Sequence, residues 1–167
     1  MISRRSMLLG TSAAAGLTLF GLSQRFAVAE GAEGEFEIML SEDEWRDRLT
    51  EEQFYVLRQH GTERPFTSPL NKNYEAGLYH CAGCDLPLYS SEVKYDSGTG
   101  WPSFWEALPD AIGTSTDTSL GMVRTECHCR RCGGHLGHIF DDGPEPTGKR
   151  HCINGVALNF VAGATNV

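Results

Sequence analysis

The six cysteines of this chain are its side chains with the clearest chemical potential, and four of them form two similar pairs. Cys81 and Cys84 lie in "CAGC", and Cys129 and Cys132 lie in "CRRC". Two cysteines three positions apart can direct both sulfur atoms to one point where the chain turns tightly between them. Two such pairs supply the four thiolates of a closed, structural zinc site. We therefore expect one structural zinc ion that links two distant segments and contributes to folding.

The paired cysteines have two other interpretations. Exported proteins commonly use cysteine pairs for disulfides, and a C-x-x-C pair can also be a redox centre. Cys127, Cys129 and Cys132 crowd into six residues, which makes a simple set of disulfides awkward. The presence of two similar pairs, rather than one, counts against a redox centre. Both interpretations stay open beside zinc.

The remaining chemistry centres on Cys152, which stands alone in "GKRHCINGVALNF". Arg150 lies two residues before it, on the same face of a strand, and His151 is adjacent. Positive charge near a thiol lowers its pKa and favours the reactive thiolate. Upstream, His135 and His138 in "CGGHLGHIFDDGP" could tune the thiol or move protons. The sequence thus indicates a cysteine nucleophile, with a buried structural cysteine as the alternative.

Two short helices should begin the folded part of the chain. In "SEDEW" and "TEEQF" a hydroxyl residue is followed three positions later by Glu or Gln, the pattern of a helix capping box. We predict helices over about 42–48 and 51–59, the second ending at Gly61. Their buried faces would be formed by Trp45, Leu49, Phe54 and Leu57.

After Gly61 the pattern changes to loops and short apolar segments. Gly, Pro, Asp and Ser punctuate segments such as "LPLYSS", "GMVRTECHC" and "HCINGVALNFV". This spacing is typical of a compact antiparallel β domain with many turns. No alternation of strands with long helices is visible, so a nucleotide-binding α/β fold is not expected.

The first 29 residues differ from everything that follows. Adjacent arginines at positions 4 and 5 precede the apolar run "MLLGTSAAAGLTLFGL", and "AVA" at 27–29 offers the small residues that a signal peptidase reads. The arginine pair favours twin-arginine export. We predict a signal peptide over 1–29, a mature domain over 30–167, and a periplasmic or otherwise exported location. An uncleaved anchor is the alternative, although 16 residues fall short of the ~20 that span a bilayer comfortably.

The charge of the mature chain argues against one class of partner. The predicted leader holds three arginines and no acidic residue, which leaves 11 basic against 22 acidic residues, a net charge near −11. So acidic a surface repels the phosphates of nucleic acids. We therefore expect no nucleic-acid partner. No second apolar stretch of the leader's length occurs, so we expect a soluble domain.

Four longer segments together resemble the B-type methionine sulfoxide reductases. They are "HGTERPFTSPLNKNYEAGLYHCAGCDLPLYSS", "SGTGWPSFWEAL", "CGGHLGHIFDDGPEPTGKRHCIN" and "LNF", in that order, between about residues 50 and 160. The resemblance implies reduction of the R epimer of methionine sulfoxide in oxidised proteins or peptides. It also implies a mainly β fold of two packed antiparallel sheets with short N-terminal helices, and zinc on the four paired cysteines. We expect the enzyme to be a monomer.

The resemblance assigns roles to the residues around the lone thiol. Cys152 matches the family nucleophile, which attacks the sulfoxide sulfur and is left as a sulfenic acid. His138 would be the principal proton donor to the leaving oxygen, with Asp142 helping to orient it and His135 beside it. Arg150 matches an arginine of the family motif.

Two further positions shape the expected substrate pocket. Asn154 matches an orienting amide of the family. Trp101, in "GWPSF", matches the tryptophan that packs against the substrate methyl group and so distinguishes one epimer from the other. Ordinary core packing remains the alternative for Trp101, and the better interpretation for Phe104 and Trp105.

The chain departs from many members of that family at the position that restores the thiol. Thr99 stands where they carry a second cysteine, in "SG-x-GW". Cys127 is the one spare thiol, and a buried core role is the favoured interpretation for it. We therefore expect an external reductant, thioredoxin-like or another thiol, to reduce Cys152. A zinc-ribbon binding module and a disulfide exchanger are the competing functions, separable by zinc content and by assay of a Cys152→Ser variant.

Overall fold

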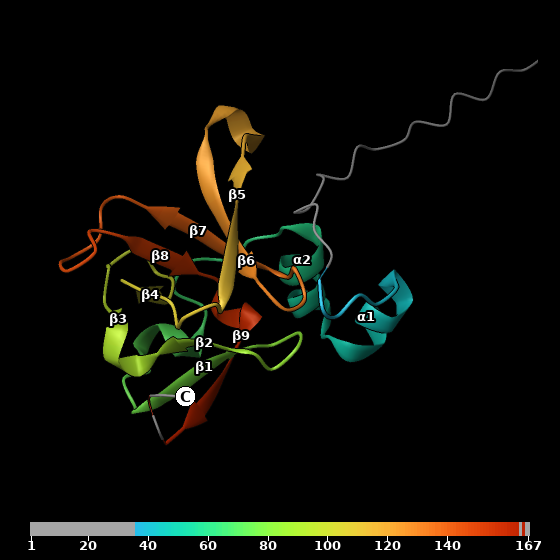
Figure 1. Cartoon of the computed structure of the whole chain (residues 1–167), viewed down its shortest axis with the longest axis horizontal. Coiled ribbons are helices and arrows are strands. Elements are labelled where there is room, and N and C mark those ends of the chain that lie inside the picture. The colour runs from blue at the N-terminus through green and yellow to red at the C-terminus, as the bar shows by residue number, and fades with distance from the viewer. Residues whose placement is uncertain (1–35, 164, 166–167) are drawn as a thin grey trace, which may run out of the picture.

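Figure 1 shows the fold of the chain as a computed structural model, which describes residues 36–163 and residue 165. The predicted leader, residues 1–29, lies outside the described residues. Within the described part of the chain, no helix has the length and apolar character needed to cross a membrane.

Two short helices precede the sheets, with the bounds that the sequence predicts. Helix α1 is Glu42–Arg48 and α2 is Glu51–Gln59, and each begins with a complete capping box. Helix α2 ends at Gln59, and its capping residue is His60 rather than the predicted Gly61, because His60 itself adopts the left-handed conformation (φ 54°). The four side chains predicted to form the buried faces are all buried.

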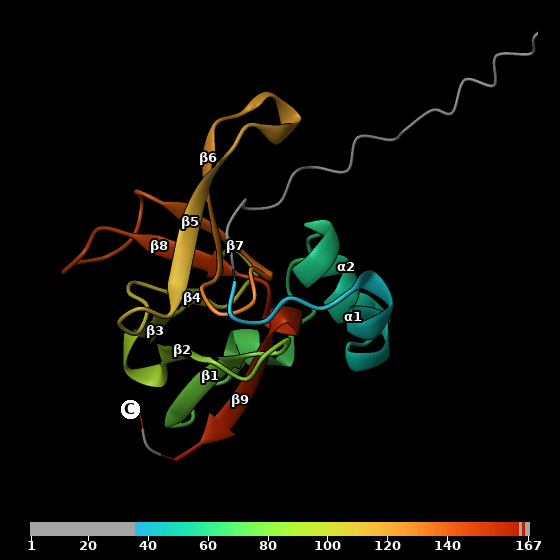
Figure 2. The ribbon, with the colours of Figure 1, turned by 45° about the vertical axis from the view of Figure 1, so that its right-hand side comes forward.

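In residues 36–163, nine strands form two antiparallel sheets, which confirms the predicted fold class (Figure 2). The smaller sheet has the order β2 (Pro87–Ser90), β1 (Gly77–Cys81), β9 (Leu158–Ala162). The larger has the order β3 (Lys94–Tyr95), β4 (Ser103–Phe104), β8 (Arg150–Ile153), β7 (His135–Phe140), β6 (Arg124–Cys129), β5 (Ile112–Asp117). In both figures the β5–β6 hairpin rises away from the body of the molecule.

Aromatic side chains from both sheets form the centre of the core. Tyr89 of β2 stacks on Phe104 of β4 with ring centroids 4.3 Å apart, and Tyr79 of β1 meets the same ring edge-on at 5.1 Å. All three side chains are fully buried. Burying an aromatic side chain of this size stabilises the fold by about 1.5–3 kcal/mol. The interpretation of Phe104 as a core residue is therefore correct, and this cluster packs the smaller sheet on the larger one.

Strand pairing in the larger sheet brings together residues that are distant in sequence. In the β7–β8 pair, His138 lies opposite Cys152. In the β4–β8 pair, Ser103 lies opposite the same cysteine. Directly opposed side chains have Cβ atoms about 4.5–5.5 Å apart. The sheet thus places the thiol of Cys152 beside the imidazole of His138, near the middle of a rigid element.

Candidate active site and metal site

The four paired cysteines converge at one point, where a strand of each sheet ends. Cys81 is the last residue of β1 and Cys129 is the last residue of β6, and each is followed by a tight turn that carries its partner. The Sγ atoms of Cys84 and Cys129 lie 3.4 Å apart, and those of Cys81 and Cys132 lie 3.8 Å apart. All four Sγ atoms lie within 4.8 Å of one another, and all four residues are buried.

These separations fit a tetrahedral metal site. Zinc–sulfur bonds of about 2.3 Å at tetrahedral angles place the sulfurs about 3.8 Å apart. A disulfide would require about 2.05 Å, and all six cysteines are free thiols. Outside the four sulfurs, the turns are tied to neighbouring elements: Arg58 donates to the carbonyl of Cys132 and Arg131 to that of Cys84. The residues present could therefore hold one metal ion with no position left for a substrate.

Cys152 lies outside this cage, in a separate small pocket. The pocket has a volume of about 130 Å³. Cys152 is partly exposed, whereas the five other cysteines are buried. Three of the predicted site residues, Trp101, His138 and Asn154, line the pocket with it. The other lining residues are Thr62, Arg124, Gly137 and Phe140.

The environment of the Cys152 thiol differs from the one expected from the sequence. Burial raises the pKa of Cys152, and the charge of Arg150 together with hydrogen bonds from Thr99 and Arg150 only partly offsets this. The expected positive charge is present, but desolvation outweighs it. The thiol therefore carries its proton at neutral pH. His151, its other basic neighbour, points to the opposite face of β8, where its Nδ1 lies 3.3 Å from the hydroxyl of Tyr89.

Arg150 is held in place by two partners. Its Nε and Nη2 donate to the two carboxylate oxygens of Asp142 at 2.8 and 2.9 Å. Its guanidinium group lies over the ring of Phe140, 4.4 Å from the centroid. This paired geometry fixes the guanidinium plane. Asp142 therefore acts on Arg150, next to the thiol, and this paired role replaces the role predicted for it at His138.

The carboxylate at His138 is Asp117, which the sequence analysis did not single out. His138 Nε2 lies 2.7 Å from Asp117 Oδ2, and Arg124 Nη2 donates to the same oxygen at 2.6 Å. Burial opposes ionisation of Asp117, but hydrogen bonds from Ser119 and His138 and the charge of Arg124 outweigh it, so its pKa is well below the usual value. Burial lowers the pKa of His138, and Asp117 partly restores it.

His135 lies behind His138 and is absent from the residues that line the pocket. It is buried, and its ring meets that of His138 edge-on with centroids 5.4 Å apart. Its Nδ1 lies 2.8 Å from Glu126 Oε1, while Ser115 and His128 bond the other oxygen of Glu126. His135 can therefore position His138, but the described geometry places no substrate beside it.

Glu126 and His135 also belong to a second group of possible metal ligands. His60 completes it, with ligand atoms of the three residues within 4.8 Å of one another. The separation of His135 and Glu126 is that of an ordinary hydrogen bond. The contacts of this group are satisfied without an ion.

Asn154 is buried, with both ends of its amide bonded to the backbone. Its Nδ2 donates to the carbonyl of Leu136 at 2.9 Å, and its Oδ1 accepts from the N–H of Glu63 at 3.0 Å. Trp101 donates its indole N–H to the carbonyl of Glu63 at 3.1 Å. Glu63 was missed as a site residue, although it lies in the segment "HGTERPF" that carried part of the family resemblance.

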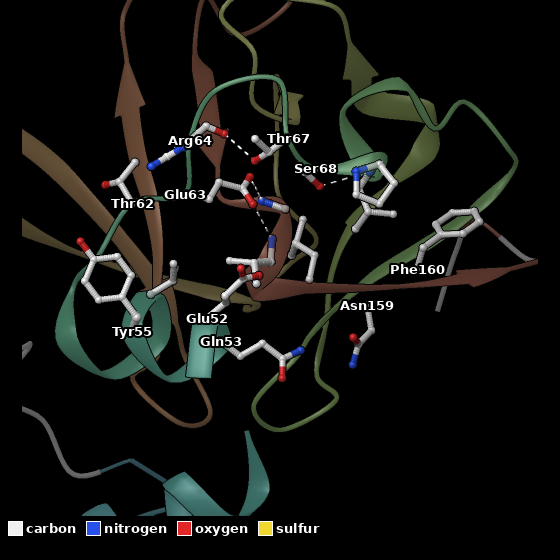
Figure 3. A pocket seen from close by; sticks show the side chains of 16 residues that line it. Glu52, Gln53, Tyr55, Thr62, Glu63, Arg64, Thr67, Ser68, Asn159 and Phe160 are labelled. Atoms are coloured by element: carbon white, nitrogen blue, oxygen red, sulfur yellow. Dashed lines mark hydrogen bonds between the residues drawn. The ribbon is translucent and has the colours of Figure 1, made fainter. Parts of the chain in front are cut away.

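A larger hollow of about 1060 Å³ lies beside the Cys152 pocket, between α2, the loop 62–70 and β9 (Figure 3). Thr62 lines both. No cysteine or histidine lines the larger hollow. The thiol of Cys152 and the imidazole of His138 line the smaller pocket instead.

The fold and the two sulfur sites define the class of this protein: a small β domain with one accessible thiol beside a histidine and a tryptophan, and a separate four-cysteine cage. A family model described as the SelR domain matches residues 49–162. The chain belongs to the SelR family.

Several curated relatives carry names that agree with this family. A protein of Agrobacterium fabrum named peptide methionine sulfoxide reductase MsrB is 55% identical over 121 residues, which cover 72% of this chain and 90% of that protein. A Methanosarcina barkeri protein of the same name is 57% identical, over 72% of this chain and 85% of its own. Human mitochondrial methionine-R-sulfoxide reductase B2 is 54% identical, over 74% of this chain and 72% of its own. The resemblance found in the sequence is confirmed.

Proposed function

We propose that this protein reduces methionine-R-sulfoxide in oxidised polypeptides to methionine, with Cys152 as the nucleophile. Membership of the SelR family and the names of its relatives support the reaction. The observation that carries the assignment to Cys152 is its position: it is the partly exposed cysteine of the six, in a pocket lined by Trp101 and His138.

The proposed chemical step moves one oxygen atom between two sulfurs. The Sγ of Cys152 attacks the sulfoxide sulfur, and the S–O bond breaks as the oxygen passes to Cys152. Methionine leaves, and Cys152 is oxidised to a sulfenic acid. The thiol is protonated at rest, so the proton that the departing oxygen needs is already in the pocket. His138 relays that proton, and Asp117 holds its ring.

Trp101 supports the choice of epimer. Its indole lines the pocket that contains Cys152, and its N–H is already bonded to the backbone of Glu63. The ring therefore offers the substrate an apolar face. An apolar face accepts a methyl group and disfavours an oxygen that would lose its hydrogen bonds to water. In the R epimer the methyl group meets Trp101 while the oxygen meets the polar side of the pocket.

External thiols complete the cycle. A first thiol displaces water from the sulfenic acid and forms a mixed disulfide with Cys152; a second thiol releases Cys152 and leaves as a disulfide. Cys127 is fully buried against Tyr89, and burial raises the pKa of its thiol to about 12. A buried, protonated thiol is a poor attacking group. We therefore propose that a thioredoxin-like protein or another thiol acts on Cys152 directly.

Cys127→Ser tests this route. We expect its steady-state turnover with thioredoxin or dithiothreitol to stay within about twofold of wild type, because Cys127 takes no part in recycling. Loss of thioredoxin-dependent turnover, with one normal turnover retained in its absence, would identify Cys127 as the resolving thiol.

We propose zinc as the ion of the four-cysteine cage. The sulfur separations and the all-cysteine ligand set support it. Cys81, Cys84, Cys129 and Cys132 would hold the ion, which supplies cross-linking of the fold and no chemistry at Cys152. One zinc per chain by atomic emission, unchanged in Cys152→Ser, is the expected result.

We also propose that residues 1–29 direct export by the twin-arginine route, on the basis of the sequence features alone. That route is thought to carry folded proteins, so the cage could load its metal in the reducing cytoplasm. Replacing Arg4 and Arg5 by lysine should retain the full-length chain in the cytoplasm, and the exported wild type should begin at Glu30. Fractionation with N-terminal sequencing measures both. Export unaffected by the double substitution would exclude the route.

An assay on the two pure epimers of a blocked methionine sulfoxide tests the reaction. With dithiothreitol as reductant, wild type should reduce the R epimer and leave the S epimer. Cys152→Ser should lose on the order of 10³-fold or more in kcat, because the nucleophile is absent. Preference for the S epimer, or normal activity in Cys152→Ser, contradicts the proposal.

A further inference from the structure

Glu63 lines the larger hollow (Figure 3), and it also hydrogen-bonds Trp101 and Asn154, which line the small pocket. It belongs to the segment 62–64, which has no regular secondary structure. Its carboxylate accepts hydrogen bonds from two successive backbone N–H groups, those of Gly155 at 2.5 Å and Val156 at 3.0 Å. These two residues directly follow Asn154, at the start of a short 3₁₀ helix, Gly155–Ala157.

The backbone of Glu63 makes two more hydrogen bonds, both to residues that line the Cys152 pocket. Its N–H donates to Asn154 Oδ1 at 3.0 Å. Its carbonyl accepts from the indole N–H of Trp101 at 3.1 Å. Trp101 and Asn154 come from different parts of the chain, 53 residues apart in sequence, and one peptide segment joins them.

The carboxylate is the part of Glu63 that fixes this segment. The N–H and carbonyl of Glu63 bond only to the side chains of Asn154 and Trp101. These side chains can move together with the loop, so these two bonds alone would not fix its position. The carboxylate instead bonds two peptide groups next to Asn154, two residues beyond the thiol. Hydrogen bonds to a charged acceptor are stronger than those between neutral groups. Together the four bonds tie the Trp101 wall of the pocket to the strand end that carries Cys152.

We propose that Glu63 is a positioning residue that holds Trp101 and Asn154 at the distance from Cys152 that the reaction needs. It touches neither substrate nor the reacting sulfur. Its effect passes through the indole that faces the substrate methyl group and through the amide beside the thiol. This inference rests on the proposed function, and it predicts that Glu63 controls both efficiency and the preference for the R epimer.

Glu63→Ala and Glu63→Gln test the role, with Glu52→Gln as the matched control. Glu52 is an exposed carboxylate that lines the same larger hollow. In Glu63→Ala we expect kcat/KM for the R epimer to fall on the order of 100-fold, the effect of a displacement of about 1 Å in a catalytic group. Glu63→Gln keeps one acceptor oxygen and should lose less. Glu52→Gln should stay within about twofold of wild type.

Two readouts separate positioning from loss of fold. The ratio of R to S activity should fall in Glu63→Ala, because a displaced indole no longer selects the methyl group. Alkylation of Cys152 by iodoacetamide needs neither Trp101 nor Asn154, so its rate should stay within about twofold of wild type, as should the zinc content. If Glu63→Ala does not fold, Glu63→Gln supplies the same comparison.

Three outcomes overturn the inference. The first is unchanged kcat/KM in the folded Glu63 variants. The second is a loss of activity with an unchanged epimer ratio. The third is a loss of activity matched by an equal loss of Cys152 alkylation or zinc. If wild type itself fails to reduce the R epimer, the proposed function fails instead, and the two failures are thereby distinguished.

Discussion

The thiol of Cys152 is partly exposed to solvent, yet it lies in an environment that favours its protonated form. Burial raises the pKa of its thiol, and Arg150 and Thr99 partly counter that effect. A protonated thiol is protected from indiscriminate oxidation, because the thiolate is the reactive form. In the proposed mechanism, the thiol reacts only once the substrate is bound and His138 can pass its proton to the departing oxygen.

Asp117→Asn tests which carboxylate serves His138. Asp117 raises the pKa of His138, so its removal should lower that pKa and move the pH limb that reports His138 to lower pH. We expect kcat/KM at pH 7 to fall about 10–100-fold, as is typical when a group that orients a histidine is lost. The pH dependence of kcat/KM measures both effects.

Two controls accompany that variant. Asp141→Asn removes an exposed carboxylate that contacts Lys149. It should leave both kcat/KM and its pH dependence unchanged. Asp142→Asn acts on Arg150 and should leave the His138 limb in place. A shift of that limb in Asp142→Asn, and none in Asp117→Asn, would restore the assignment expected from the sequence.

His151 gives a prediction about acid stability. Burial lowers its pKa to about 4, against about 6.5 in the unfolded chain. Between pH 6.5 and 4 the unfolded chain therefore binds a proton that the folded chain does not, and stability falls as the pH falls. His151→Phe removes this loss, on the order of 1–3 kcal/mol across that range. Urea unfolding of wild type and His151→Phe at pH 7 and pH 4.5 measures this loss of stability. An equal loss in both proteins would contradict the prediction.

The sequence predicted which residues form the site better than it predicted which residues contact them. Cys152, His138 and Trp101 could be named from their motifs, and the structure gathers them in one pocket. Asp117 could not, because 21 residues separate it from His138 and only strand pairing joins them. Glu63 could not be named either, because its carboxylate bonds backbone N–H groups of Gly155 and Val156, about 90 residues further along the chain, and no local pattern joins them.

The β7–β8 pair is the element on which the site depends. Gly137 lies opposite Ile153, and a Cβ on Gly137 would overlap the carbonyl of Cys152. Only glycine allows the strands to approach this closely. In the neighbouring pair Cys152 lies directly opposite His138, so the thiol and the imidazole share one face of the sheet.

Gly137→Ala should force β7 and β8 apart. We expect a loss of about 1–3 kcal/mol in the free energy of unfolding and a larger loss of activity, because Cys152 and His138 separate. Gly83→Ala is the control, since its Cβ would meet no atom closer than 3.6 Å. Wild-type activity in Gly137→Ala would show that the strands tolerate the shift.

The two helices were predictable to the residue, whereas the strand order was not. Capping boxes are local patterns, so four consecutive residues are enough to predict where each helix begins. The order β3-β4-β8-β7-β6-β5 depends on which short segments pair across long distances. Short, irregularly spaced strands carry too little pattern to specify their partners.

Across the whole molecule, the cysteine cage joins the two sheets. Cys81 ends a strand of the smaller sheet, and Cys129 ends a strand of the larger one. The spacing argument predicted a link between distant segments, and the structure shows that those segments belong to different layers. The four cysteines belong to the same buried core cluster as the aromatic side chains Tyr79, Tyr89 and Phe104.

Removal of the metal should loosen this interface first. We expect Cys84→Ser to lose the ion and about 3 kcal/mol of stability, which lowers Tm by on the order of 10 °C. Differential scanning calorimetry with and without added zinc measures it, and Cys127→Ser, which alters a buried cysteine outside the cage, is the control. An unchanged Tm in Cys84→Ser would show that the cage contributes nothing to folding.

The contact between Thr99 and Cys152 bears on how many partners the protein needs. Thr99 Oγ1 lies 4.0 Å from Cys152 Sγ, so a sulfur carried by residue 99 would meet the oxidised one within a single chain. Thr99→Cys should therefore consume two thiols per sulfoxide in a single turnover without reductant, where wild type consumes one; titration of free thiols counts them. Reduction of the oxidised Cys152 would then change from a bimolecular encounter with an external thiol to formation of a disulfide within one chain. Dilution of the protein and the reductant would no longer slow that step.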